Sequence, residues 1–169
     1  MSDEQPQSRQ SASVTQATET SEPVPWASGG ARPSILVVED DPQHWEIYGK
    51  ILWYNGYDVM HADTGNEAYR LACEHKPDLV LLDLMIPDMH GTELCRRLKR
   101  RRATARIPIL VLSGTPYAEA GAAALDAGCA AYMEKPAVPT EVLHRVEELI
   151  GRPPLPGEGS APTVFPPMA

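Results

Sequence analysis

Five short apolar runs alternate with five amphipathic segments between residues 34 and 151, and this alternation limits the possible folds more than any other feature of the chain. The apolar runs are predicted to be strands and the amphipathic segments helices. The strands are expected at about 35–38, 57–61, 79–82, 107–112 and 129–133, and the helices between Asp41 and Asn55, between Thr64 and Pro77, from Gly91 to about Arg101, from about Tyr117 to Ala127, and after Pro139. Strand and helix in strict alternation predict an α/β fold: a doubly wound, three-layer sandwich with a parallel sheet and right-handed crossovers.

The two ends of the chain have a different composition. Residues 1–33 are rich in Ser, Gln, Thr, Glu and Pro, and their few apolar side chains show no period. Such a segment buries too little surface to offset the entropy of ordering it, so we predict a disordered tail. Residues 152–169 are rich in proline and are predicted to form a second disordered tail. One domain is therefore expected, over residues 34–151.

Charge and cysteine content exclude several classes of protein. The formal net charge is -8, which disfavours general nucleic-acid binding and attraction to anionic membranes. The three cysteines are scattered and lack CxxC spacing, so neither a disulfide framework nor a zinc site is indicated. No apolar run reaches membrane-spanning length. We expect a cytoplasmic protein that is not inserted in a membrane.

Polar and charged side chains follow four of the five predicted strands. Glu39, Asp40 and Asp41 follow the first strand, Asp83 the third, Ser113 the fourth and Lys135 the fifth. The carboxyl ends of parallel strands meet at one edge of a sheet, where such folds place their ligands. Carboxylates gathered there repel one another unless a cation lies among them, and hard oxygen ligands suit Mg²⁺, with Mn²⁺ as the alternative. Helix capping alone could explain Asp41, but it does not explain Asp83 together with Lys135.

Four segments in this order resemble the receiver domain of bacterial two-component response regulators, of the stand-alone type. The segments are Val37 to Asp40, Leu82 to Pro87 with Gly91, Leu112 to Gly114, and Tyr132 to Pro136. The resemblance covers about residues 33–151. It implies a flavodoxin-like fold with the strand order 2-1-3-4-5.

The resemblance also implies a role for each site residue. Asp83 corresponds to the phosphoacceptor, and Lys135 would pair with a phosphoryl oxygen. The Mg²⁺ ligands correspond to Glu39, Asp40 and Asp83, together with the backbone carbonyl of Met85. The switch residues correspond to Ser113 and Tyr132. The implied phosphodonor is a sensor histidine kinase or a histidine phosphotransfer protein. The implied output is altered binding of an unknown protein, or of a second copy of this chain, through the surface of the fourth helix, fifth strand and fifth helix.

The residues of this edge disfavour two other functions and leave one alternative to a phosphoacceptor switch. A phosphatase with an aspartyl nucleophile needs a second acid at the position of Met85, so a turnover enzyme is not expected. An FMN-binding module needs a phosphate loop where Glu39, Asp40 and Asp41 stand. A receiver-like scaffold, whose partner binding does not depend on phosphorylation, stays open as the alternative. No direct DNA binding is expected, because no second domain follows the fifth helix, and the protein is expected to be a monomer or a phosphorylation-dependent homodimer.

Three further hypotheses concern side chains near this edge of the sheet. Spacing places His44, Ile47, Tyr48 and Ile51 on one buried face of the first helix, with His44 interpreted as a core or boundary histidine. Trp45 would then lie off this face, either as an exposed contact for the phosphodonor or partly buried against a neighbouring loop. Since Met85 cannot orient a water molecule strongly, the modified state is predicted not to be especially short-lived.

Overall fold

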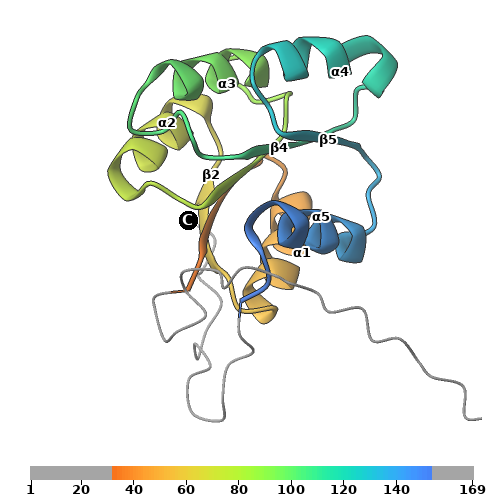
Figure 1. Cartoon of the computed structure of the whole chain (residues 1–169). Helices are drawn as coiled ribbons and strands as arrows, with labels where there is room; N and C mark the ends of the chain where they lie inside the picture. The colour runs from red at the N-terminus through yellow and green to blue at the C-terminus, as the bar shows by residue number, and fades with distance from the viewer. Residues whose placement is uncertain (1–31, 154–169) are drawn as a thin grey trace, which may run out of the picture.

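The computed structural model describes residues 32–153, which form a parallel sheet between two layers of helices (Figure 1). In chain order the elements are β1 (Ser34–Val38), α1 (Pro42–Tyr54), β2 (Asp58–Ala62), α2 (Gly65–His75), β3 (Leu79–Leu82), α3 (Gly91–Arg100), β4 (Ile109–Ser113), α4 (Tyr117–Asp126), β5 (Ala131–Glu134) and α5 (Pro139–Ile150). The sheet has the order β2-β1-β3-β4-β5, and every pairing is parallel. The predicted α/β fold and its strand order are confirmed. Both predicted tails lie outside the described residues, apart from a few positions at their inner ends.

Two hydrophobic clusters lie on opposite faces of the sheet. Helices α2, α3 and α4 cover one face, and α1 and α5 cover the other (Figure 1). Strand β3 lies in the middle of the sheet, and all four of its residues are buried. Because helices cover both of its faces, this strand has a continuous aliphatic sequence rather than an alternating one.

The predicted helix ends are largely confirmed. The Asp41 carboxylate accepts hydrogen bonds from the backbone N–H groups of Gln43 and His44, at 2.8 and 3.3 Å, and so caps α1. Thr64 caps α2 by accepting a hydrogen bond from the Glu67 N–H. These bonds satisfy donors that have no partner inside the helix. Val138 precedes α5 and provides no side-chain cap.

The predicted buried face of α1 is wrong in two places. Trp45 is only 2% exposed and its indole stacks on His61, with ring centroids 4.3 Å apart, whereas Ile47 is 48% exposed. The face that packs on the sheet contains Trp45, Tyr48 and Leu52. These positions are also spaced three and four apart, and the large indole buries more apolar surface than Ile47 would. The hypothesis that Trp45 is an exposed contact for the phosphodonor is therefore overturned.

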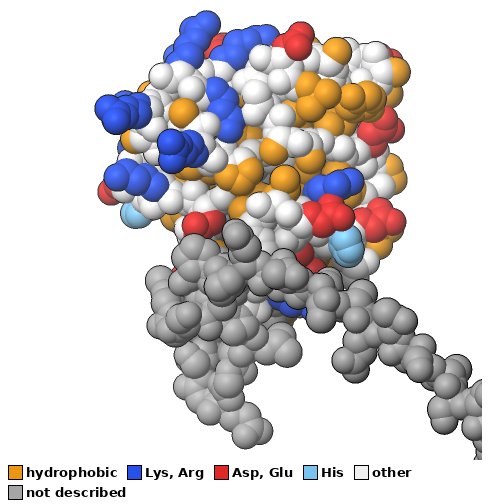
Figure 2. All heavy atoms as spheres, viewed as in Figure 1, with side chains coloured by type: hydrophobic (Ala, Val, Ile, Leu, Met, Phe, Trp, Pro, Cys, Tyr) orange, Lys and Arg blue, Asp and Glu red, His pale blue; other side chains and the backbone are white. Residues whose placement is uncertain are grey.

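Lys and Arg side chains gather on the part of the surface over α2 and α3 (Figure 2). The last turn of α3 contains Arg97, Lys99 and Arg100, where cations interact favourably with the helix dipole. Lys99 points inward instead, and its ammonium donates to the carbonyls of Ala105 and Ile107 at 3.2 and 2.6 Å. These bonds hold the loop between α3 and β4 against the helix.

Among residues 32–153, none of the helices combines the length and the apolar character that crossing a membrane requires.

Candidate functional site

The predicted site residues meet at the carboxyl edge of the sheet. The Asp83 N–H donates to the Val38 carbonyl at 3.0 Å, which joins the end of β3 to the end of β1. The Lys135 N–H donates to the Ser113 carbonyl at 2.8 Å, which joins the end of β5 to the end of β4. Adjacent parallel strands thus place residues from four parts of the sequence in one small region.

Three carboxylates form the acidic part of the site. One oxygen each from Glu39, Asp40 and Asp83 lies within 4.8 Å of the others. Glu39 is buried, Asp83 is partly buried and Asp40 is exposed. Hard carboxylate oxygens at this spacing, with one side open to water, fit the coordination that Mg²⁺ prefers. These residues therefore suit a magnesium ion.

Lys135 reaches into the acidic cluster from the end of β5. Its ammonium Nζ lies 2.5 Å from Glu39 Oε2 and 2.8 Å from Asp83 Oδ2, and its side chain is 10% exposed. Burial disfavours the charged ammonium, but the hydrogen bonds to the two carboxylates outweigh burial and raise the pKa of Lys135. The pKa of Glu39 is also raised, because its burial outweighs the attraction of Lys135. The ammonium is thus the cation that holds this cluster of acids together.

The loop after β3 holds Asp83 in place. The Met85 N–H donates to Asp83 Oδ1 at 2.9 Å, so each carboxylate oxygen of Asp83 has a separate partner. Gly91 allows the start of α3 to approach this loop, since a Cβ on Gly91 would lie 2.7 Å from Leu84 Cα and 2.9 Å from the Asp83 carbonyl oxygen. Met85, the position expected to provide a carbonyl ligand, is 63% exposed at the rim.

Asp88, later in the same loop, connects this loop to the start of α2 by hydrogen bonds. Its carboxylate accepts hydrogen bonds from the backbone N–H groups of Gly65 and Asn66, at 2.7 and 2.9 Å. Burial raises the pKa of Asp88, but these N–H donors outweigh burial and lower it below its usual value. Sequence reasoning missed this residue, because its partners lie 22 and 23 positions away.

Ser113 and Tyr132 share a partner in the loop after β4. Ser113 is fully buried and its Oγ accepts a hydrogen bond from the Thr115 N–H at 3.2 Å. The half-buried Tyr132 donates its hydroxyl to the Thr115 carbonyl at 2.5 Å, and its ring meets the edge of Tyr117. Burial raises the pKa of the Tyr132 phenol. The two predicted switch residues are therefore connected through one short loop.

His44 is a site residue whose contact the sequence did not reveal. Its Nδ1 lies 3.2 Å from Lys135 Nζ and 3.7 Å from Glu39 Oε1. The expected core or boundary position is correct in part, because the side chain is 40% exposed. Its partner lies 91 positions away in the sequence, so no local signal could have identified the pair.

The comparisons with known proteins agree with this geometry. The family model of the response regulator receiver domain matches residues 35–147. The chain belongs to this family. Its acidic cluster and its lysine lie where the strand order of the fold places a site.

Curated relatives of this receiver include two transcriptional regulators that are longer than the matched region. The chain is 38% identical over 120 residues to the DNA-binding dual master transcriptional regulator RpaA of Synechocystis, an alignment that covers 71% of this chain and 50% of RpaA. It is 35% identical over 129 residues to the phosphate regulon regulator PhoB of Pseudomonas aeruginosa, covering 76% of this chain and 56% of PhoB. The chain thus spans about half the length of these relatives.

Solved structures show the same fold. A response regulator from Chloroflexus aurantiacus superposes with a TM-score of 0.69 and 31% identity, covering 72% of this chain and all of that one. The receiver domain of a sensor histidine kinase from Pseudomonas aeruginosa superposes with a TM-score of 0.67 and 28% identity, covering 72% of this chain and 99% of that one; its structure has a magnesium ion in the active-site cleft.

Trp45 is expected to report on cation binding in this receiver. Its indole stacks on His61, and His61 Nε2 lies 2.8 Å from the carbonyl oxygen of Glu39. A movement of Glu39 on cation binding would therefore alter the surroundings of the Trp45 indole through His61. We predict that Mg²⁺ changes the tryptophan fluorescence saturably and that Trp45→Phe removes this change, whereas Trp53→Phe keeps it. Calorimetric Mg²⁺ binding with no fluorescence response in the wild type would contradict the prediction.

Proposed function

We propose that the receiver accepts a phosphoryl group on Asp83 from a phosphohistidine, in a reaction that depends on Mg²⁺. The observation that carries this proposal is the arrangement of Asp83 between a lysine ammonium and two further carboxylates. An acid placed in this way is a nucleophile beside a cation site. The protein is proposed to act as a switch that turns over no substrate.

In the proposed reaction, an Asp83 oxygen forms a bond to phosphorus while the phosphorus–nitrogen bond of the donor breaks. The electron pair of that bond leaves with the donor imidazole. Lys135 lies within hydrogen-bond distance of Asp83 and would donate to an oxygen of the arriving group. When bound, Mg²⁺ would be held by Glu39, Asp40 and Asp83 and would supply positive charge next to the transferring phosphoryl group. Preorganised cations and donors of this kind are the main source of rate acceleration in phosphoryl transfer.

Ser113 and Tyr132 are proposed to transmit the modification. A phosphoryl oxygen on Asp83 offers a stronger acceptor to the Ser113 hydroxyl, whose oxygen now accepts from the Thr115 N–H. A shift of Thr115 would change the carbonyl that Tyr132 contacts and hence the position of the phenol ring. The neighbouring Tyr117 of α4 is 49% exposed, so such a shift would alter the surface offered to a partner.

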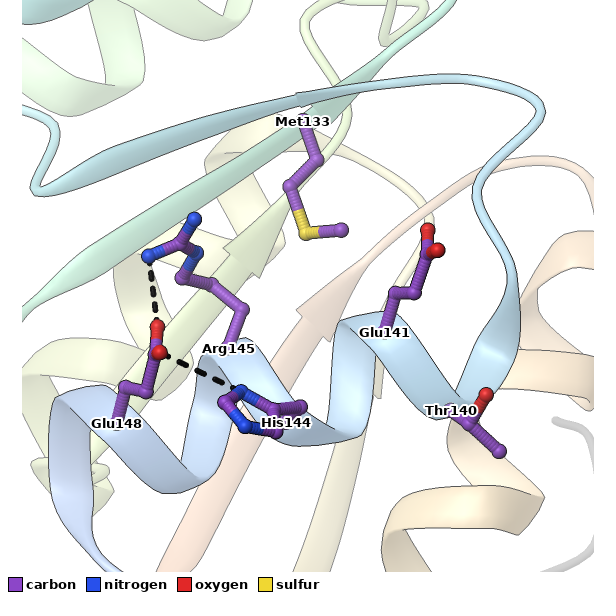
Figure 3. A pocket seen from close by; sticks show the side chains of 6 residues that line it. All are labelled: Met133, Thr140, Glu141, His144, Arg145 and Glu148. Atoms are coloured by element: carbon purple, nitrogen blue, oxygen red, sulfur yellow. Dashed lines mark hydrogen bonds and ion pairs between the residues drawn. The ribbon is translucent and has the colours of Figure 1, made fainter.

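The surface of α4, β5 and α5 is the proposed partner surface. Leu125 of α4 is 44% exposed, and a shallow pocket lies between Met133 of β5 and side chains of α5 (Figure 3). At its rim Glu148 pairs with His144 and Arg145 (Figure 3). A sensor kinase or phosphotransfer protein is the proposed donor, and a protein is the proposed target. RpaA is described as DNA-binding, but the net charge of -8 over the full chain supports protein contacts for this protein.

The test of the proposed function is incubation of the full chain with Mg²⁺ and acetyl phosphate, followed by intact mass. We expect a gain of one phosphoryl group that is prevented by EDTA and removed by hydroxylamine, because acyl phosphates react with hydroxylamine. An unmodified chain, given both acetyl phosphate and a phosphorylated kinase, would overturn the proposal and favour a scaffold whose binding does not depend on phosphorylation.

A further inference from the structure

His44 lies within hydrogen-bond distance of Lys135, but it makes no hydrogen bond to Asp83. The Lys135 ammonium has three partners within hydrogen-bond distance: Glu39 Oε2 at 2.5 Å, Asp83 Oδ2 at 2.8 Å and His44 Nδ1 at 3.2 Å. A lysine ammonium can only donate, so Nδ1 is the acceptor and the imidazole proton lies on Nε2. His44 is the uncharged member of the three partners in this arrangement.

The backbone of His44 is fixed by the start of α1. Its N–H donates to the capping carboxylate of Asp41 at 3.3 Å, in the first turn of the helix. The imidazole therefore projects from a rigid element toward the rim of the site, where it is 40% exposed. The backbone that carries the imidazole is thus held by the cap of α1, and not by Glu39 or Asp83.

The two carboxylates that bind Lys135, Glu39 and Asp83, have a second role in the proposed function. Glu39 and Asp83 are also proposed ligands of Mg²⁺, and their oxygens cannot be shared freely between a metal ion and an ammonium. If these carboxylates turned toward a bound metal, Lys135 would lose hydrogen bonds while its side chain is almost fully buried. A buried ammonium that lacks acceptors is costly, so a third partner outside the metal ligands becomes more important in that state.

We propose that His44 is a positioning residue for Lys135, holding its ammonium at the site when Glu39 and Asp83 bind Mg²⁺. This proposal rests on the proposed function. His44 keeps Lys135 close to Asp83, where the ammonium meets an incoming phosphoryl oxygen. Removing His44 then weakens the metal-bound state more than the metal-free state, since Lys135 has fewer other acceptors there.

The test uses Mg²⁺ binding by calorimetry and the rate of phosphoryl acceptance from acetyl phosphate. We expect His44→Leu to weaken Mg²⁺ binding and to slow acceptance, each by about fivefold, as the loss of one hydrogen bond predicts. His44→Asn is the matched control, because its Oδ1 is the same number of bonds from the backbone as Nδ1. It should stay within about twofold of the wild type.

A double-mutant cycle separates this role from a structural one. In a Lys135→Met background, His44→Leu is expected to change Mg²⁺ affinity by less than about twofold, because the effect acts through the lysine. An equal loss in both backgrounds, or wild-type Mg²⁺ affinity in His44→Leu, would overturn the proposal. Absence of phosphoryl acceptance in the wild type would instead contradict the proposed function, and Mg²⁺ affinity would still decide the role of His44.

Discussion

Asp83→Asn is expected to abolish phosphoryl acceptance while the fold persists. The amide has nearly the same shape as the carboxylate, and its single oxygen can still accept a hydrogen bond from Lys135, while the Met85 N–H, whose bond to Asp83 lies at the exposed rim, can turn to water. It is a far poorer nucleophile, and it removes one charge from the acidic cluster. Intact mass after incubation with Mg²⁺ and acetyl phosphate should show no added group, and circular dichroism should match the wild type.

Asp58→Asn provides the matched control for this experiment. Asp58 begins β2 at the opposite edge of the sheet, and its side chain is 60% exposed. The same chemical change there should leave acceptance within experimental error of the wild type. A phosphoryl group on Asp83→Asn that is stable to denaturation would show that another residue is the acceptor.

Lys135→Met is expected to cause the largest change in stability at the site. The side chains of Lys135, Glu39 and Asp83 are only 10%, 5% and 11% exposed. Removing the ammonium leaves two buried carboxylates without their cation, which costs about 3 kcal/mol of unfolding free energy. Urea unfolding in EDTA measures this loss. Phosphoryl acceptance should also slow about a hundredfold, since a preorganised donor to the reacting group is lost.

Magnesium should restore part of the stability of Lys135→Met. A metal bound by the folded state alone raises the unfolding free energy with its concentration, and in this variant no ammonium competes for the carboxylates. Mg²⁺ is thus expected to stabilise the variant more than the wild type. The control is Lys50→Met, which breaks an exposed pair with Glu46 and should leave the unfolding free energy almost unchanged. If Mg²⁺ raised the unfolding free energy of Lys135→Met and of the wild type equally, the idea that Lys135 and the metal compete for the same carboxylates would be contradicted.

Much of the fold was predictable because buried positions in helices and strands recur at regular spacing and are occupied by apolar residues. Strand β3 is buried on both faces and is therefore continuously aliphatic, and Asp83 follows where that burial ends. The helix caps Asp41 and Thr64 were predictable as well, because a cap bonds to N–H groups two or three residues away. Local interactions of this kind need no knowledge of the tertiary structure.

The buried face of α1 was not predictable from spacing. Positions 44, 47, 48 and 51 and positions 45, 48 and 52 both have helical spacing, and both contain apolar residues. Which of the two faces is buried depends on the side chains of the sheet against which α1 packs. His61 of β2 provides a flat ring on which Trp45 stacks, and this leaves Ile47 on the outer side.

That Glu39, Asp83 and Lys135 lie together was predictable from the sequence, because parallel strands bring their carboxyl ends to one edge of the sheet and these residues follow those ends. How those residues are connected is a property of the folded molecule. Lys135 bonds to Glu39, Asp83 and His44, which are 96, 52 and 91 positions away. Contacts at such separations leave no local pattern, since they depend on how the helices and loops pack around the edge of the sheet.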